Sequence, residues 1–345
     1  MTLLFITSGL LLGWSLGAND AANIFGSAVG SRMVSFRTAA MVASVSVIAG
    51  AVLQGSGTSE TLGALGSVSA LGGAFTVALA AAGTVFMMTR SAIPVSTTQA
   101  IVGAIVGWNI YTGNKTDLTT LTTIVSTWVS GPILGGIFAV VLYLLLKRFK
   151  RKAGIHLIRF ESYIRAGLIV AAAFGAFSLG ANNIANVMGV FVTAAPLPDI
   201  VVGSLTVSGA QQLFFIGGIA IAAGIVTYSA KVIETVGRNI FDLSSEAALV
   251  VVLSQSIVLF LFSSVALSNL MGNAGLPYLP LVPVSSSQVV IGSILGLGLY
   301  KGARNLNFKI LGMVSIGWVL TPLVSGVITY ISLFFVENVF VIDVV

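Results

Sequence analysis

The 345-residue sequence contains no cysteine and only one histidine, His156. Without cysteine there is no disulfide, thiolate metal site or cysteine nucleophile to consider. Charged residues are also scarce, at 8% of the chain, against 57% hydrophobic residues and a mean hydropathy of +1.06. So little polar surface cannot cover a water-soluble globule, so the composition predicts a membrane protein whose solvent is lipid.

Apolar stretches run almost from end to end of the chain. Because a bilayer core about 30 Å thick takes about 20 residues per helix, we predict an all-α polytopic fold of about ten spans, with room for re-entrant hairpins. The expected spans are 3–29, 38–53, 70–88, 95–111, 118–146, 166–192, 200–228, 247–270, 284–300 and 310–336. No basic residue precedes the first stretch and no small-residue cleavage site follows it, so we expect a retained span rather than a secretory signal.

The 16 Lys and Arg residues lie mostly in alternate predicted loops. Ten crossings would place all of them except Lys115 on one side of the membrane, which the positive-inside rule makes cytoplasmic. We therefore expect a multi-pass protein of the plasma or inner cell membrane with both termini outside the cytoplasm. The basic charge is explained by topology, so we expect no nucleic-acid partner.

Two polar motifs occur twice, in the same order. The first is Gly-Ala-Asn-Asp-Ala-Ala-Asn at 17–23, which recurs as Gly-Ala-Asn-Asn-Ile-Ala-Asn at 180–186. The second is Pro-Val-Ser-Thr-Thr-Gln at 94–99, which recurs as Pro-Val-Ser-Ser-Ser-Gln at 283–288. Two shorter matches follow the same order: Glu60-Thr61 with Glu234-Thr235, and Trp128 and Pro132 with Trp318 and Pro322.

With five predicted spans in each half, the second half would enter the membrane from the opposite side. This predicts an inverted-topology repeat, an architecture typical of secondary transporters. The expected organisation is a first membrane repeat at 1–146, a basic cytoplasmic connector at 147–165 and a second, inverted repeat at 166–345.

The first copy of the asparagine motif places Asp20 inside an apolar span, where an ionised carboxylate costs several kcal/mol unless it is paired or hydrated. No Lys or Arg lies at comparable depth, so the expected partner is a bound cation, with Asn19 and Asn23 adding carboxamide oxygens. Sodium, a hard cation, would suit Asp20 and Asn23. The alternative is that the small residues serve close helix contact and the asparagines join neighbouring helices.

The second motif predicts proline at the first helical position and three hydroxyls in the first turn. The free N–H groups and the positive end of such a helix favour an anion without any basic side chain. Two such turns from opposite sides of the membrane could surround a tetrahedral oxyanion. Ordinary helix capping by Ser or Thr is the alternative.

The remaining candidates are weaker. Glu60 and Glu234 fall near predicted span ends, where a solvated carboxylate is the default, although their matched positions keep them as cation-site candidates. His156 lies in the basic connector, where we expect a solvated residue. We find no phosphate-binding loop or dinucleotide motif, and no base or metal set beside a nucleophile, so we expect neither an enzyme nor a cofactor.

Taken together, the repeated motifs and the segment 231–237 resemble the inorganic phosphate transporter (PiT) family over nearly the whole chain. The resemblance implies symport of inorganic phosphate with sodium or protons through a central site. The implied substrate site is Asn19, Asp20, Ser96, Thr97, Thr98, Asn182, Asn183, Ser285, Ser286 and Ser287. Combined with the matched positions in the two halves, this gives an expected cation site of Asp20, Asn23, Asn186, Gln99, Gln288, Glu60 and Glu234.

Two departures from the family pattern keep the substrate open. Asn183 stands where the family usually has aspartate, and Gln99 and Gln288 stand where histidine is common. One carboxylate fewer leaves a sulfate permease of the same fold as the first alternative. An anion channel is the second, since rings of polar groups also form selectivity filters. The expected partners are phosphate or sulfate, the lipid bilayer and, as an open option, a second copy of the chain.

Overall fold

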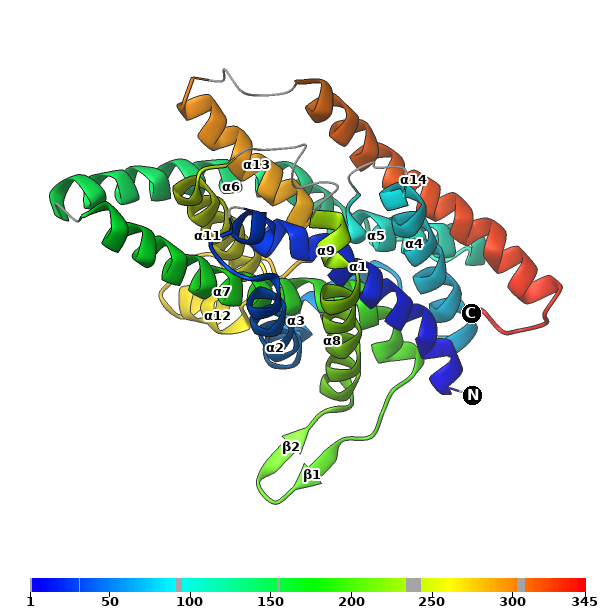
Figure 1. The fold of residues 1–345 in the computed structure, drawn as a ribbon. Coiled ribbons are helices and arrows are strands. Elements are labelled where there is room, and N and C mark those ends of the chain that lie inside the picture. The colour runs from blue at the N-terminus through cyan, green and yellow to red at the C-terminus, as the bar shows by residue number, and fades with distance from the viewer. Residues whose placement is uncertain (1, 31, 91–94, 154–155, 234–242, 303–307) are drawn as a thin grey trace.

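The computed structural model describes residues 2–30, 32–90, 95–153, 156–233, 243–302 and 308–345 (Figure 1). These residues are mostly helical, as the composition predicts. The helices of the first part are α1 Thr2–Gly30, α2 Phe36–Gln54, α3 Ser56–Leu65, α4 Leu71–Arg90, α5 Thr97–Thr112 and α6 Leu118–Ala153. Those that follow are α7 Leu157–Ala194, α8 Gly209–Thr227, α9 Ser229–Val232, α11 Ser245–Leu261, α12 Val265–Asn273, α13 Ser286–Tyr300 and α14 Phe308–Asn338.

Six helices in the described part of the chain are long and apolar enough to cross a bilayer, namely α2, α4, α6, α7, α8 and α14. A seventh results if α11 and α12 form one broken span. The helix α1 contains Asn19, Asp20 and Asn23, and α5 and α13 have only 16 and 15 residues. The multi-pass helical fold is therefore confirmed, while the number of ten spans stays a prediction.

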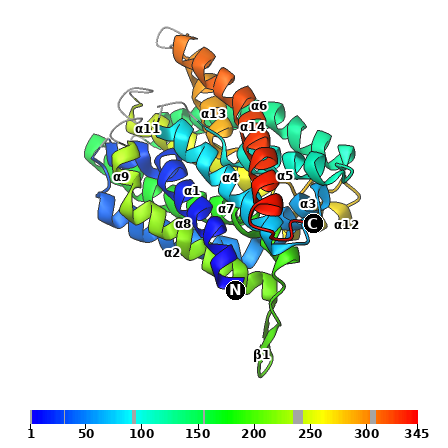
Figure 2. The same cartoon turned by 90° about the vertical axis from the view of Figure 1, so that its right-hand side faces the viewer.

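Two predicted spans are wrong in detail. The span at 200–228 begins with a hairpin of β1 Ile200–Val202 and β2 Leu205–Val207, with Gly203 at φ 63° in the turn. Figure 2 shows this hairpin projecting beyond the helices at the end that carries the N-terminus. The residues of this hairpin are as apolar as those of a membrane-spanning helix, which is why hydropathy predicted a span here. Their β-branched side chains favour extended strands, and the glycine allows the tight turn between the strands. The span at 247–270 is broken, since α11 and α12 meet at a bend of 67°.

The basic connector is mainly helical, rather than the loop that we expected. The helix α6 continues through its basic residues to Ala153, and α7 begins at Leu157. Basic side chains in the last turn of α6 suit the negative end of the helix dipole. One of them, Lys150, pairs with Glu246 at the start of α11, with 2.5 Å between Nζ and Oε1.

The two halves of the chain pack on each other reciprocally. The helix α2 packs on α7 as α8 packs on α1, and α13 packs on α6 as α14 packs on α5. Glycines make these contacts possible in both copies: a Cβ on Gly17 would lie 1.9 Å from Ile221 O, and one on Gly180 would lie 2.1 Å from Val47 O. Only residues without a side chain allow backbones to approach this closely.

Candidate anion and cation site

The two hydroxyl motifs form the N-terminal turns of the short helices α5 and α13. Ser96 and Ser285 are their N-caps, and each Oγ accepts a hydrogen bond of 3.3 Å from the backbone N–H three residues later. The first hydroxyl of each motif is thus an ordinary cap, and the others occupy the first turn. Pro283 precedes the cap, so its prediction as the first helical residue is wrong; Pro94 lies outside the described residues.

These two turns interlock. The hydroxyl of Ser287 on α13 donates to Val95 O at 3.2 Å, and the hydroxyl of Thr98 on α5 donates to Val284 O at 3.4 Å. Each turn therefore contacts the backbone that leads into the other turn. The two positive helix ends, predicted from separate halves of the sequence, lie side by side.

The asparagine motifs of α1 and α7 flank this junction. Ser286 donates to Oδ2 of Asp20 at 2.7 Å. On the α7 side, Asn186 Nδ2 donates to Oγ1 of Thr98 and to Oδ1 of Asn183, each at 2.9 Å. Segments far apart in the sequence thus join in one polar cluster. Its members are exposed by 8% or less: Asp20, Ser96, Thr97, Thr98, Gln99, Asn182, Asn183, Asn186, Ser285, Ser286, Ser287 and Gln288.

Several buried atoms of the cluster have no hydrogen-bond partner among the described residues. Two are donors, the hydroxyl of Thr97 and Nδ2 of Asn183, and three are carboxamide oxygens, of Asn186, Gln99 and Gln288. Buried polar groups are nearly always paired, so these atoms have capacity for a ligand. The donors suit an oxyanion, and the carboxamide oxygens suit a hard cation or a protonated ligand oxygen.

Asp20 is the one charged side chain that is buried in the described part of the chain. The ion pair found among those residues, Lys150 with Glu246, lies elsewhere. A carboxylate oxygen at this depth keeps acceptor capacity beyond the single Ser286 bond. A cation beside Asp20 would remove the cost of an unpaired charge.

Other predicted site residues lie apart from the cluster or serve the backbone. Asn19 and Asn23 are half-buried on α1, and among the described residues no hydrogen bond links them to the cluster. Glu60 is exposed on α3, and Glu234 falls outside the described residues. Asn182 uses both ends of its carboxamide on the non-helical segment before α13, donating to Val282 O at 3.1 Å and accepting from Val284 N at 2.7 Å.

Sequence reasoning missed two supporting threonines on α3. The hydroxyl of Thr58 donates to Ala181 O at 3.2 Å, and that of Thr61 donates to Leu281 O. They attach α3 to the asparagine motif of α7 and to the segment that leads into α13. The repeated Glu-Thr pair did mark α3 as a region of interest, but it directed attention to the carboxylate instead of the hydroxyls.

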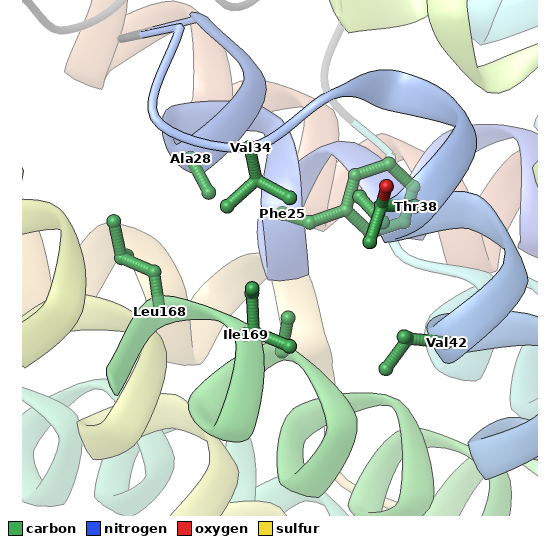
Figure 3. Close-up of a pocket in the computed structure, with 9 residues that line it drawn as sticks. Phe25, Ala28, Val34, Thr38, Val42, Leu168 and Ile169 are labelled. Carbon is green, nitrogen blue, oxygen red and sulfur yellow. The ribbon is translucent and has the colours of Figure 1, made fainter. Parts of the chain in front are cut away.

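A separate pocket between α1, α2 and α7 does not contain this cluster. Figure 3 shows it lined by Phe25, Ala28, Val34, Thr38, Val42, Leu168 and Ile169. Its polar side chain is Thr38, whose hydroxyl already hydrogen-bonds Ser35 at 2.8 Å. A lining so poor in donors does not suit a small hydrated ion.

Residues 16–329 match the sequence profile of the phosphate transporter family. The chain belongs to this family. Its members are transporters rather than enzymes, which confirms the resemblance drawn from the motifs and supports phosphate transport.

Individual members of the family align over most of the chain. A provisionally named phosphate permease of Methanocaldococcus jannaschii is 28% identical over 316 residues, covering 92% of this chain and 91% of that protein. One of Thermococcus kodakarensis is 26% identical, covering 95% of each. The solved structure titled "The sodium-dependent phosphate transporter" has the same fold, with a TM-score of 0.76, 23% identity and coverage of 98% of this chain and 99% of that one.

Proposed function

We propose that the chain is a symporter that imports inorganic phosphate across the cell membrane, driven by a sodium or proton gradient. The observation that carries the proposal is the interlocked pair of hydroxyl turns. Their cluster holds buried donors that have no partner in the described part of the chain, together with the buried carboxylate of Asp20. Its anion site needs no basic side chain because helix N-termini and hydroxyls supply the donors. Family members named as phosphate permeases support this substrate.

The proposed mechanism is alternating access by two inverted repeats of five spans, 1–146 and 166–345, joined by the basic segment 147–165 on the cytoplasmic side. The reciprocal packing of α2 with α7 and α8 with α1 supports the repeat. Broken helices that meet at the repeat interface are typical of substrate sites in such transporters. The termini and the β-hairpin would then lie outside the cytoplasm.

Charge balance explains why a cation should accompany the anion. Asp20 and a phosphate anion would both be negative within the membrane, where unbalanced charge is costly. A cation held by Asp20 and by carboxamide oxygens such as that of Asn186 would offset this repulsion. Sodium is the first choice, since the structure of matching fold bears a sodium-dependent title. A proton on Asp20 is the second.

Sulfate is a second candidate substrate because of Asn183. Its Nδ2 is a buried donor without a partner among the described residues, where an aspartate would present only acceptors. Sulfate at neutral pH has no proton to donate, so a donor-rich site suits it. Hydrogen phosphate needs at least one acceptor, and Asp20 can supply it.

Purified protein in proteoliposomes tests the proposal. Uptake of radiolabelled phosphate and of radiolabelled sulfate would be measured with an inward sodium gradient or an inward proton gradient imposed separately. We expect saturable phosphate uptake that one gradient stimulates and that excess unlabelled phosphate inhibits. If sulfate is taken up and phosphate is not, sulfate is the substrate. Non-saturable flux that depends on neither gradient would favour a channel.

A further inference from the structure

The repeated Trp-Pro motif contributes no side chain to the polar cluster. Trp128 and Pro132 lie in α6, and Trp318 and Pro322 lie at corresponding places in α14. These helices carry the two short helices of the site, since α13 packs on α6 and α5 packs on α14. The motif therefore belongs to the elements that support the hydroxyl turns.

Glycines of the short helices meet the prolines of the supporting helices. A Cβ on Gly103 of α5 would lie 2.1 Å from Pro322 O, and one on Gly292 of α13 would lie 2.2 Å from Pro132 O. One turn further along, Gly107 meets Gly326 and Gly296 meets Gly136 in the same way. Both helices of each pair thus run in the same direction along one line of contact.

One turn before these contacts, each pair of helices carries a glutamine and a tryptophan. Residues four apart lie on the same face of a helix, so Gln99 precedes Gly103 and Trp318 precedes Pro322 along the same line. By the same spacing, Gln288 and Trp128 are level with each other in the other pair. Each glutamine immediately follows the hydroxyls of its turn.

The facing groups are chemically complementary but not yet joined. Nε1 of Trp128 and of Trp318 is buried without a hydrogen-bond partner among the described residues, and so is Oε1 of Gln288 and of Gln99. An indole N–H can only donate, and a carboxamide oxygen can only accept. The same pair of orphaned groups at the same place in both halves indicates a shared purpose, because buried polar atoms are rarely left unpaired.

We propose that the indole N–H of each tryptophan donates to the carboxamide oxygen of the facing glutamine, Trp128 to Gln288 and Trp318 to Gln99, when the anion binds at the hydroxyl turns. Trp128 and Trp318 are then positioning residues for the two hydroxyl turns. The inference rests on the proposed function. Each Trp–Gln hydrogen bond, here called a clasp, holds one hydroxyl turn in place around the substrate.

A double-mutant cycle on phosphate uptake into proteoliposomes tests the clasp. Trp128→Phe and Gln288→Met each remove one partner while keeping much of the volume. We expect each to lower Vmax/KM by about three- to ten-fold, the value of one lost hydrogen bond. The double variant should lose no more than either single variant, whereas Trp128→Phe with Gln99→Met, the matched control from the other clasp, should multiply the two losses. Multiplied losses in both combinations would overturn the proposal.

Crosslinking provides a readout that does not depend on transport. The sequence has no cysteine, so the pair Trp128→Cys with Gln288→Cys introduces the only two thiols. A short thiol-specific crosslinker should join this pair in membranes, more so with phosphate present, and should not join Trp128→Cys with Gln99→Cys. Absence of the first crosslink would overturn the clasp. If the double-cysteine variant forms the crosslink but the cysteine-free wild-type protein transports no phosphate, the proposed function alone would be overturned.

Discussion

The two hydroxyl turns have the same backbone contacts but different side-chain partners. Ser287 and Thr98 make equivalent bonds to Val95 O and Val284 O. Yet the α13 turn meets a carboxylate, through the 2.7 Å bond from Ser286 to Asp20, and the α5 turn meets a carboxamide, through the 3.3 Å bond from Thr98 to Asn183. The scaffold is duplicated and the charge is not, so cation coupling should depend mainly on the α1 side of the site.

The largest effect expected is from Asp20→Asn, which makes the two sides alike. Gradient-driven phosphate uptake should fall by at least about 100-fold, because the variant loses the buried charge that we expect to hold the cation. Asn is nearly isosteric, so the protein should still elute as a folded species in size-exclusion chromatography. Asp117→Asn, at an exposed carboxylate, is the control and should keep wild-type uptake. Wild-type rates in Asp20→Asn would refute the cation assignment.

Substitutions at the glycine contacts should affect both halves equally. Gly103→Ala and Gly292→Ala each place a Cβ against a proline carbonyl, so each should destabilise the protein by about 1 to 3 kcal/mol through overpacking. Thermal unfolding in detergent measures the loss. Gly83→Ala, where an added Cβ meets nothing within 4 Å, should be neutral or slightly stabilising. A large loss in only one half would show that the two contacts are not equivalent.

Removal of one hydroxyl from each turn should show the asymmetry of charge. Ser286→Ala deletes a bond to a carboxylate, worth about 1.5 to 3 kcal/mol, and should reduce Vmax/KM for phosphate by about ten- to 100-fold. Thr98→Val deletes bonds to neutral groups and should cost only about two- to ten-fold. The half-saturating phosphate concentration and the cation dependence would be measured for both. Equal losses would mean that Asp20 is not ionised in the working site.

Restoration of a carboxylate at position 183 should alter the coupling more than the rate. Asn183→Asp adds a negative charge and removes the Nδ2 donor, so the site should need more cation to accept the same anion. Uptake should depend more steeply on sodium or proton concentration, and sulfate should weaken relative to phosphate, which can donate a hydrogen bond to the new carboxylate. An unchanged slope and an unchanged phosphate-to-sulfate ratio would place residue 183 outside the site.

The smallest effect is expected at Glu60. Its side chain is exposed on α3, away from the cluster. Glu60→Gln should therefore leave uptake and its cation dependence within about two-fold of wild type, since charges exposed to solvent are strongly screened. Thr58→Val, on the same helix but bonded to Ala181 O, should reduce uptake more. The opposite order would restore Glu60 as a cation-site candidate.

Much of the site could be predicted from the sequence because its polar residues contrast with an apolar surrounding. A carboxylate inside a span and a repeated hydroxyl turn are conspicuous for that reason. The role of Asn182 was not predictable, because a carboxamide that holds the backbone of residues 282–284 has the same sequence signature as one that binds a ligand. The hairpin after α7 and the break after α11 were missed because hydropathy measures burial in lipid and not chain direction.

The reciprocal packing also affects how the protein is made. The helices α1 and α2 have their main partners, α8 and α7, in the second half of the chain. When the first half leaves the ribosome, the helix surfaces at Gly17 and Gly50 have no partner backbone to pack against until Ile221 and Phe177 have been synthesised. Until then, the first half lies in the membrane with Asp20 not yet covered by its partner helices. Assembly therefore depends on the complete chain, and neither half is expected to fold alone.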